Sequence, residues 1–79
     1  MSEQEKRIIE TYKEAVEFYN FVKTDNDRRY ADAQVDGMKE MAEAFGYILY
    51  AHHKCGLIGG KYDYITLAKD GKVLVEVPV

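Results

Sequence analysis

Cysteine, proline and tryptophan are almost missing from this chain of 79 residues, which has one cysteine, one proline and no tryptophan. A single cysteine excludes an intramolecular disulfide. Long apolar runs are missing too, since runs such as "YILYA" are far shorter than the roughly 20 residues of a transmembrane helix. The N-terminal "MSEQEKRIIE" also lacks the apolar core of a signal peptide. We therefore expect a cytoplasmic protein that does not associate with membranes.

An excess of basic residues is missing as well. The net charge is -3, and it divides into -1 for residues 1–24, -2 for 25–54 and zero for 55–79. Without a basic segment to neutralise phosphates, we expect no nucleic-acid partner. Hydrophobic residues make up 47% of the chain and charged residues 32%, which is ordinary for a globular protein. We expect one folded domain over residues 1–79.

The first predicted helix spans residues 2–23. Ser2 followed by Glu5 forms a capping box, which is typical of a helix N-terminus. An apolar stripe then recurs at steps of four, three, four and three residues, a spacing that places its members on one helix face. These residues are Ile8, Tyr12, Ala15, Tyr19 and Val22.

The second predicted helix spans residues 26–54. Its apolar row has the same helical spacing and consists of Met38, Met41, Phe45, Ile48 and His52. Gly46 inside this helix is either a tolerated weak spot or kink, or a place where a neighbouring backbone comes close. The polar segment "TDND" at 24–27 offers N-cap residues, so we place a break there and expect an antiparallel helical hairpin. One uninterrupted helix that dimerises along its length stays open as an alternative.

Residues 62–68 and 73–78 are predicted to form a β-hairpin around Asp70-Gly71, a pair suited to a two-residue type I′ turn. Pairing outward from this turn gives an apolar face that we expect to lie on the helices. Its pairs are Ala68 with Val73, Thr66 with Val75, Tyr64 with Val77 and Tyr62 with Val79. The predicted fold class is α+β: an antiparallel two-helix hairpin followed by a C-terminal two-stranded β-hairpin (ααββ).

Both histidines and the only cysteine lie in "AHHKCGLIGGK", residues 51–61. On a helix His52 and Cys55 share a face and His53 points away, so one subunit offers two ligands where zinc needs three or four. We interpret this stretch as the end of the second helix, with Gly56 closing it. We predict no metal site, no cofactor and no catalytic residue. A metal-binding protein centred on His52 and Cys55 and completed by a second copy is the alternative.

Tyrosines and an unprotected strand edge carry the indications of function. Tyrosine is enriched at protein interfaces, and a lone hairpin leaves unpaired edges that normally need cover. The candidate interaction residues are Tyr47, Tyr50, Tyr62, Tyr64 and Ile65.

We therefore predict a small non-enzymatic protein-protein interaction module that forms a homodimer. Two copies could join hairpin edges into a four-stranded sheet, or pack their helical hairpins into a four-helix layer. The lysine substitution Ile65→Lys is expected to dissociate an edge-joined dimer. The alternative is an inhibitor or regulator that docks on a larger enzyme, such as one encoded by a mobile element.

Overall fold

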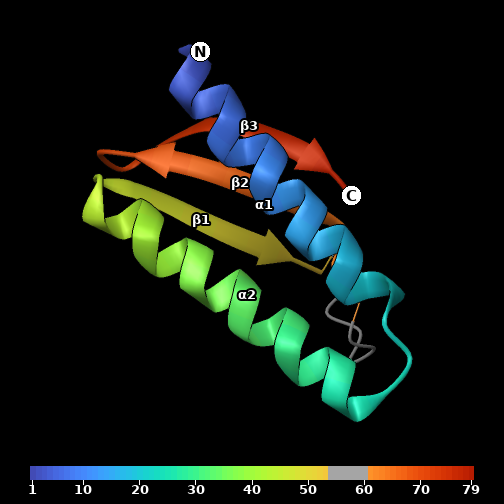
Figure 1. Cartoon of the computed structure of the whole chain (residues 1–79). Helices are drawn as coiled ribbons and strands as arrows, with labels where there is room; N and C mark the ends of the chain where they lie inside the picture. Colours follow the sequence, from blue (N-terminus) through green and yellow to red (C-terminus); the bar gives the residue numbers. More distant parts are fainter. Residues whose placement is uncertain (54–60) are drawn as a thin grey trace.

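The computed structural model describes residues 1–53 and 61–79, and it shows two helices followed by a three-stranded antiparallel sheet (Figure 1). The predicted α+β class is confirmed, with three strands in place of the expected two. The elements are α1 (Glu3–Phe21), α2 (Asp25–Ala44), β1 (Tyr47–His52), β2 (Tyr64–Lys69) and β3 (Lys72–Pro78). The strand order is β1-β2-β3, so β2 is central and the other two strands form the edges.

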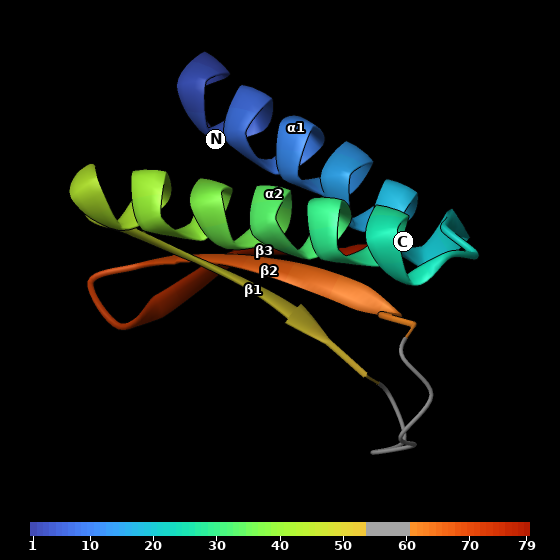
Figure 2. The same cartoon turned by 60° about the horizontal axis from the view of Figure 1, so that its bottom comes forward.

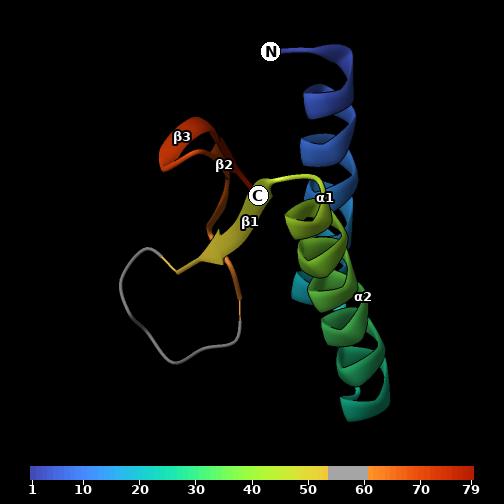
Figure 3. The same cartoon turned by 90° about the vertical axis from the view of Figure 1, so that its left-hand side faces the viewer.

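Both helices lie on the same face of the sheet (Figures 2 and 3). The apolar core fills the space between these two layers, and its largest fully buried side chains are Tyr12, Val16, Leu49, Ile65 and Leu67. No other described element covers the opposite face of the sheet. Within the described ranges, neither helix is long and apolar enough to cross a bilayer.

Helix α1 begins at the predicted capping box. The Ser2 hydroxyl accepts a hydrogen bond from the Glu5 backbone N–H at 3.2 Å, and Glu5 Oε1 accepts one from the Ser2 backbone N–H at 2.9 Å. The Tyr47 hydroxyl donates to Glu5 Oε2 at 3.0 Å. The Ser2 backbone N–H, and next the Tyr47 hydroxyl, hold the pKa of the Glu5 carboxyl below its usual range. The cap thus also ties the helix start to β1.

The break between the helices falls where the sequence predicts it. Helix α1 ends at Phe21, and the Thr24 hydroxyl accepts a hydrogen bond from the Asp27 backbone N–H at 3.2 Å, which caps α2. The uninterrupted helix is therefore wrong.

The predicted extension of the second helix to residue 54 is wrong. Helix α2 ends at Ala44, and Gly46 then takes a positive φ of 85°, which leads the chain into β1. In β1, Tyr47 and Leu49 are buried while Ile48 and Tyr50 are exposed, the alternation of a half-buried strand. The apolar row at helical spacing runs across this chain reversal, and its last members belong to the strand.

Two glycines of the predicted helix give a matched test of this turn. Gly46→Ala should lower the free energy of unfolding by roughly 1 kcal/mol, because an L-residue is strained at positive φ. The cause differs from the predicted close approach, since a Cβ at Gly46 would meet nothing within 4 Å. Gly37→Ala should raise stability by about 0.5 to 1 kcal/mol, because Gly37 lies inside α2 with equally free space. Urea denaturation measures both, and equal signs would contradict this account.

The hairpin turn forms as predicted, but the pairing beyond it differs. Asp70 and Gly71 both have positive φ, 53° and 79°, as a type I′ turn requires. Ala68 pairs with Val73 as expected. A register shift between Leu67 and Ala68 follows, so the strand partners change from there on.

This one-residue shift reverses which side of β2 faces the helices, while Val75, Val77 and Val79 of the other strand segment pack on the core as predicted. Leu67 pairs with Val75 and Ile65 with Val77, and this side packs into the core. Thr66 and Tyr64, predicted to face the helices, lie on the other side. The predicted position of Ile65 is therefore wrong: it is 0% exposed in the central strand, where β1 and β3 pair with both edges.

Candidate interaction surface

The sheet face turned away from the helices, which we call the open sheet face, is built from three cross-strand rows. The first row consists of Ile48, Ala68 and Val73, the second of Tyr50, Thr66 and Glu76, and the third of His52, Tyr64 and Pro78. Glu76 is the only Asp, Glu, Lys or Arg among these nine positions. Depletion of charge at the centre of a surface is the compositional mark of protein interfaces.

Aromatic rings stack along one end of the open sheet face. The rings of His52 and Tyr64 are stacked with centroids 4.6 Å apart, and Tyr50 lies 5.1 Å from His52 at a tilt of 32°. His52 Nε2 and the Thr66 hydroxyl are hydrogen-bonded at 2.9 Å. Lys39 Nζ lies 4.8 Å from the Tyr50 ring centroid. These contacts hold the rings in fixed positions, and a rigid apolar surface loses little entropy when it is covered.

Of the five predicted interaction residues, the structure places two on the open sheet face, Tyr50 and Tyr64. Tyr47 and Ile65 belong to the buried core. Lys69 Nζ lies over the Tyr47 ring at 4.9 Å, and the Tyr47 hydroxyl is already bonded to Glu5. Neither core side chain can present its surface to a partner in this fold.

Tyr62 lies apart from the open sheet face. It belongs to the segment just before β2 and contacts α1. Its ring is 5.1 Å from that of Tyr19 and stacks on His53 at 4.7 Å. Asn20 holds its backbone, because Asn20 Nδ2 donates to the Tyr62 carbonyl at 2.9 Å and Asn20 Oδ1 accepts from the Tyr62 N–H at 2.8 Å. Burial, and next the proximity of Tyr19, raise the pKa of Tyr62.

The predicted shared helix face for His52 and Cys55 is wrong, because His52 lies in β1. Cys55 and Gly56 lie outside the described residues. His53 Nδ1 is hydrogen-bonded to the Lys61 carbonyl oxygen. Within 1–53 and 61–79, no group of three or more His, Cys, Asp or Glu side chains is arranged to hold a metal ion.

Among the residues of the open sheet face that sequence reasoning misses, Ile48 and Val73 are the large, exposed apolar side chains. The helical spacing places Ile48 in a helix row, and the regular hairpin pairing places Val73 on the side that packs on helices. The short run of aromatic and branched residues over Tyr47–His52, directly after Gly46, is the signal that could have identified the strand. The exposure of Val73 depends on the bulge in β3, for which the local sequence carries no clear mark.

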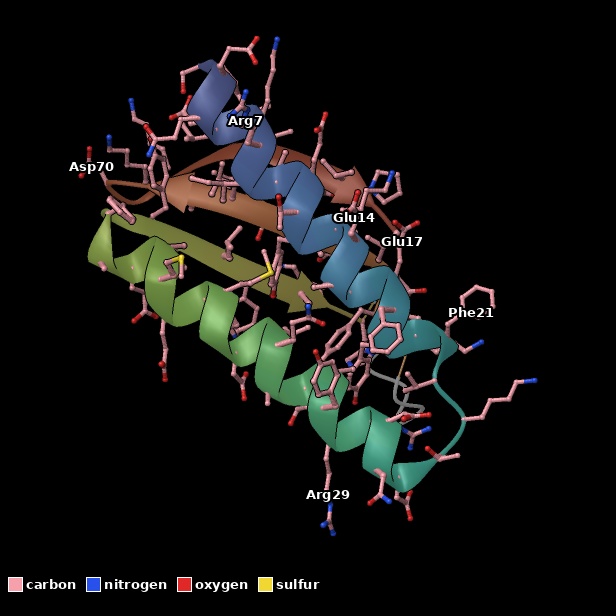
Figure 4. The ribbon with its side chains drawn as sticks, in the orientation of Figure 1. Arg7, Glu14, Glu17, Phe21, Arg29 and Asp70 are labelled. Carbon is pink, nitrogen blue, oxygen red and sulfur yellow. The ribbon has the colours of Figure 1, made fainter. Side chains whose placement is uncertain are left out.

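Charge divides unevenly between the two layers of the protein. Residues 1–46, which hold both helices, carry 11 acidic and seven basic side chains, a net charge of -4. Glu14 and Glu17 project outward from α1 (Figure 4). The helix layer is therefore acidic on the outside, in contrast to the open sheet face.

Comparison with protein-family models, curated proteins and solved structures finds no match to this chain.

Proposed function

We propose that this protein is a non-enzymatic protein-protein interaction module, and that two copies associate through their open sheet faces. The observation that carries the proposal is the open sheet face itself, where ordered rings and aliphatic side chains surround a single carboxylate.

Charge favours the sheet over the helices as the contact between copies. A four-helix layer would bring together two surfaces of net charge -4, and like charges at an interface oppose association. Two open sheet faces bring together one carboxylate each, with the Lys39 ammonium of α2 beside the Tyr50 ring. Packed sheets lie about 10 Å apart with interdigitated side chains. Sheet-on-sheet packing also leaves both acidic helix layers in solvent.

The size of the face sets the expected strength of the dimer. Three strands about 4.8 Å apart, with six residues of about 3.3 Å each, give a face of roughly 14 by 20 Å. The resulting area, about 280 Å², is less than the roughly 800 Å² per partner of a standard stable interface. We therefore expect a reversible dimer that dissociates on dilution.

Lysine substitutions on the open sheet face test the proposal. Ile48→Lys and Val73→Lys should each weaken dimerisation at least about tenfold, because each places a charge within an apolar contact. The two residues are 50% and 64% exposed, so both variants should fold. Sedimentation velocity over a dilution series measures the dissociation constant.

Phe21→Lys is the matched control, because Phe21 is 82% exposed and projects away from the end of α1 (Figure 4). It should dimerise as the unmodified protein does. A protein that stays monomeric at every concentration would overturn the dimer and favour docking on a larger enzyme. Dimers that both sheet variants leave unchanged would move the contact to another surface.

A further inference from the structure

A second apolar surface lies on the opposite side of the molecule, between the two helices. The helices diverge toward the start of α1 and the end of α2 (Figures 1 and 2). A groove of about 560 Å³, which we call the helix groove, opens between them, with Leu49 of β1 among its lining residues. Its apolar walls are Ile8 on α1 and Met38, Met41, Ala42 and Phe45 at the end of α2.

The helix groove contains most of the apolar row that predicted the core face of the second helix. The residues of α2 that are buried are Ala31, Val35 and Ala42. Met41 and Phe45 lie beside this buried stripe and are 66% and 62% exposed. Two large apolar side chains at one helix end, beside a groove that reaches the core, form a surface suited to a binding partner.

The shape and composition of the helix groove fit an α-helix. An amphipathic helix binds in an apolar groove through side chains at positions i, i+3, i+4 and i+7. Methionine side chains are flexible and polarizable, so Met38 and Met41 can adapt to the side chains of such a helix.

Charge identifies the kind of helix. Glu40 and Glu43 lie on the same turns of α2 as the groove residues, and Glu3 lies on its α1 rim. Two cations lie nearby, Arg7 on that rim and Lys39, whose Nζ lies over the Tyr50 ring, within a helix layer of net charge -4. A second copy would bring another acidic layer, and an anionic membrane or nucleic acid would be repelled. A helix with a basic polar face is attracted.

We propose that the helix groove binds a basic amphipathic helix of another protein. This surface is independent of the open sheet face, because the helices and the open sheet face lie on opposite sides of the strands (Figure 3). A dimer joined through its sheets would present two helix grooves outward. The protein would then bring two copies of its partner together.

A pair of synthetic peptides tests the occupant. The first is a fluorescent helix of about 18 residues, five turns, with leucines at i, i+3, i+4 and i+7 and lysines elsewhere. The second has the same leucines, with glutamate in place of every lysine. The lysine peptide should bind at least about tenfold more tightly by fluorescence anisotropy. Equal binding of the two peptides would overturn the role of charge.

A double variant tests the site. Met41→Gln with Phe45→Gln should weaken binding of the lysine peptide at least about tenfold, and circular dichroism should show an unchanged fold because both side chains are exposed. Phe21→Gln is the matched control and should bind normally, as should Ile48→Lys, which removes only the proposed dimer. Normal binding by the double variant would overturn the site. If the double variant instead lost self-association, the occupant of the helix groove would be a second copy, and the proposed basic helix would be wrong.

Discussion

Ile65→Lys should unfold this protein, whereas Ile48→Lys should leave it folded. Both isoleucines lie in the same sheet and receive the same new side chain, but they point to opposite faces. Ile65 is fully buried between the sheet and the helices, and Ile48 is half exposed on the open sheet face. The pair therefore separates the effect of burial from the effect of placing lysine in a strand.

The size of the effect at Ile65 follows from two costs. Truncating an isoleucine to alanine in a well-packed core already lowers the free energy of unfolding by about 2 to 5 kcal/mol. An unpaired ammonium adds several kcal/mol of desolvation, while a domain of this length has a total stability of only about 4 to 12 kcal/mol. Ile48→Lys should cost less than about 1 kcal/mol, because a surface change away from caps and networks has little effect on folding.

Circular dichroism and urea denaturation at one fixed protein concentration distinguish the two variants. Ile65→Lys should show little helix and no cooperative transition, and Ile65→Ala should give a measurable transition at clearly lower urea. If Ile65→Lys instead yielded a folded monomer, Ile65 would lie at an exposed edge as the sequence predicts, and the pairing of Ile65 with Val77 would be wrong.

Local signals in the sequence predict most of the fold. The Ser2 cap, the break before α2 and the Asp70-Gly71 turn each depend on a few neighbouring residues whose chemistry acts at short range. The apolar stripe of α1 is also correct, because Tyr12 and Ala15 are buried and the rest of the stripe lies half buried beside them. These elements need no knowledge of distant contacts.

The errors come from features set at long range. Gly46 sits in a segment whose apolar spacing fits a helix, and only pairing of Tyr47–His52 with β2 makes that segment a strand. The bulge in β3 reverses the faces of β2 relative to the regular pairing, and the core favours it because Ile65 and Leu67 then become buried beside Val77 and Val75. A single shift of this kind moves a whole set of side chains to the other side.

The candidate surfaces are predictable only in part for the same reason. Residue type alone identifies Tyr50 and Tyr64, and they do lie on the open sheet face. Residue type points to Tyr47 and Ile65 as well, but their burial follows from the third strand. The helix groove arises because part of an apolar helix row has no described element to cover it, which composition alone does not reveal.

Asn20→Leu should produce the second-largest loss of stability, about 2 to 4 kcal/mol. The Asn20 side chain is bonded to both the N–H and the carbonyl of Tyr62, a partly buried residue 42 positions away. Leucine has nearly the same shape but offers neither donor nor acceptor. Each partly buried backbone group left without a partner costs about 1 to 3 kcal/mol.

Asn26→Leu provides the matched control, because Asn26 is exposed in the first turn of α2 and is expected to change stability little. Hydrogen exchange adds a local measurement: the Tyr62 amide should exchange faster in Asn20→Leu even where β2 stays protected. The same bonds hold Tyr62 between Tyr19 and His53, so losing them should release the start of β2 from α1. Unchanged protection at Tyr62 would mean that packing of these rings, and not the amide of Asn20, positions the strand.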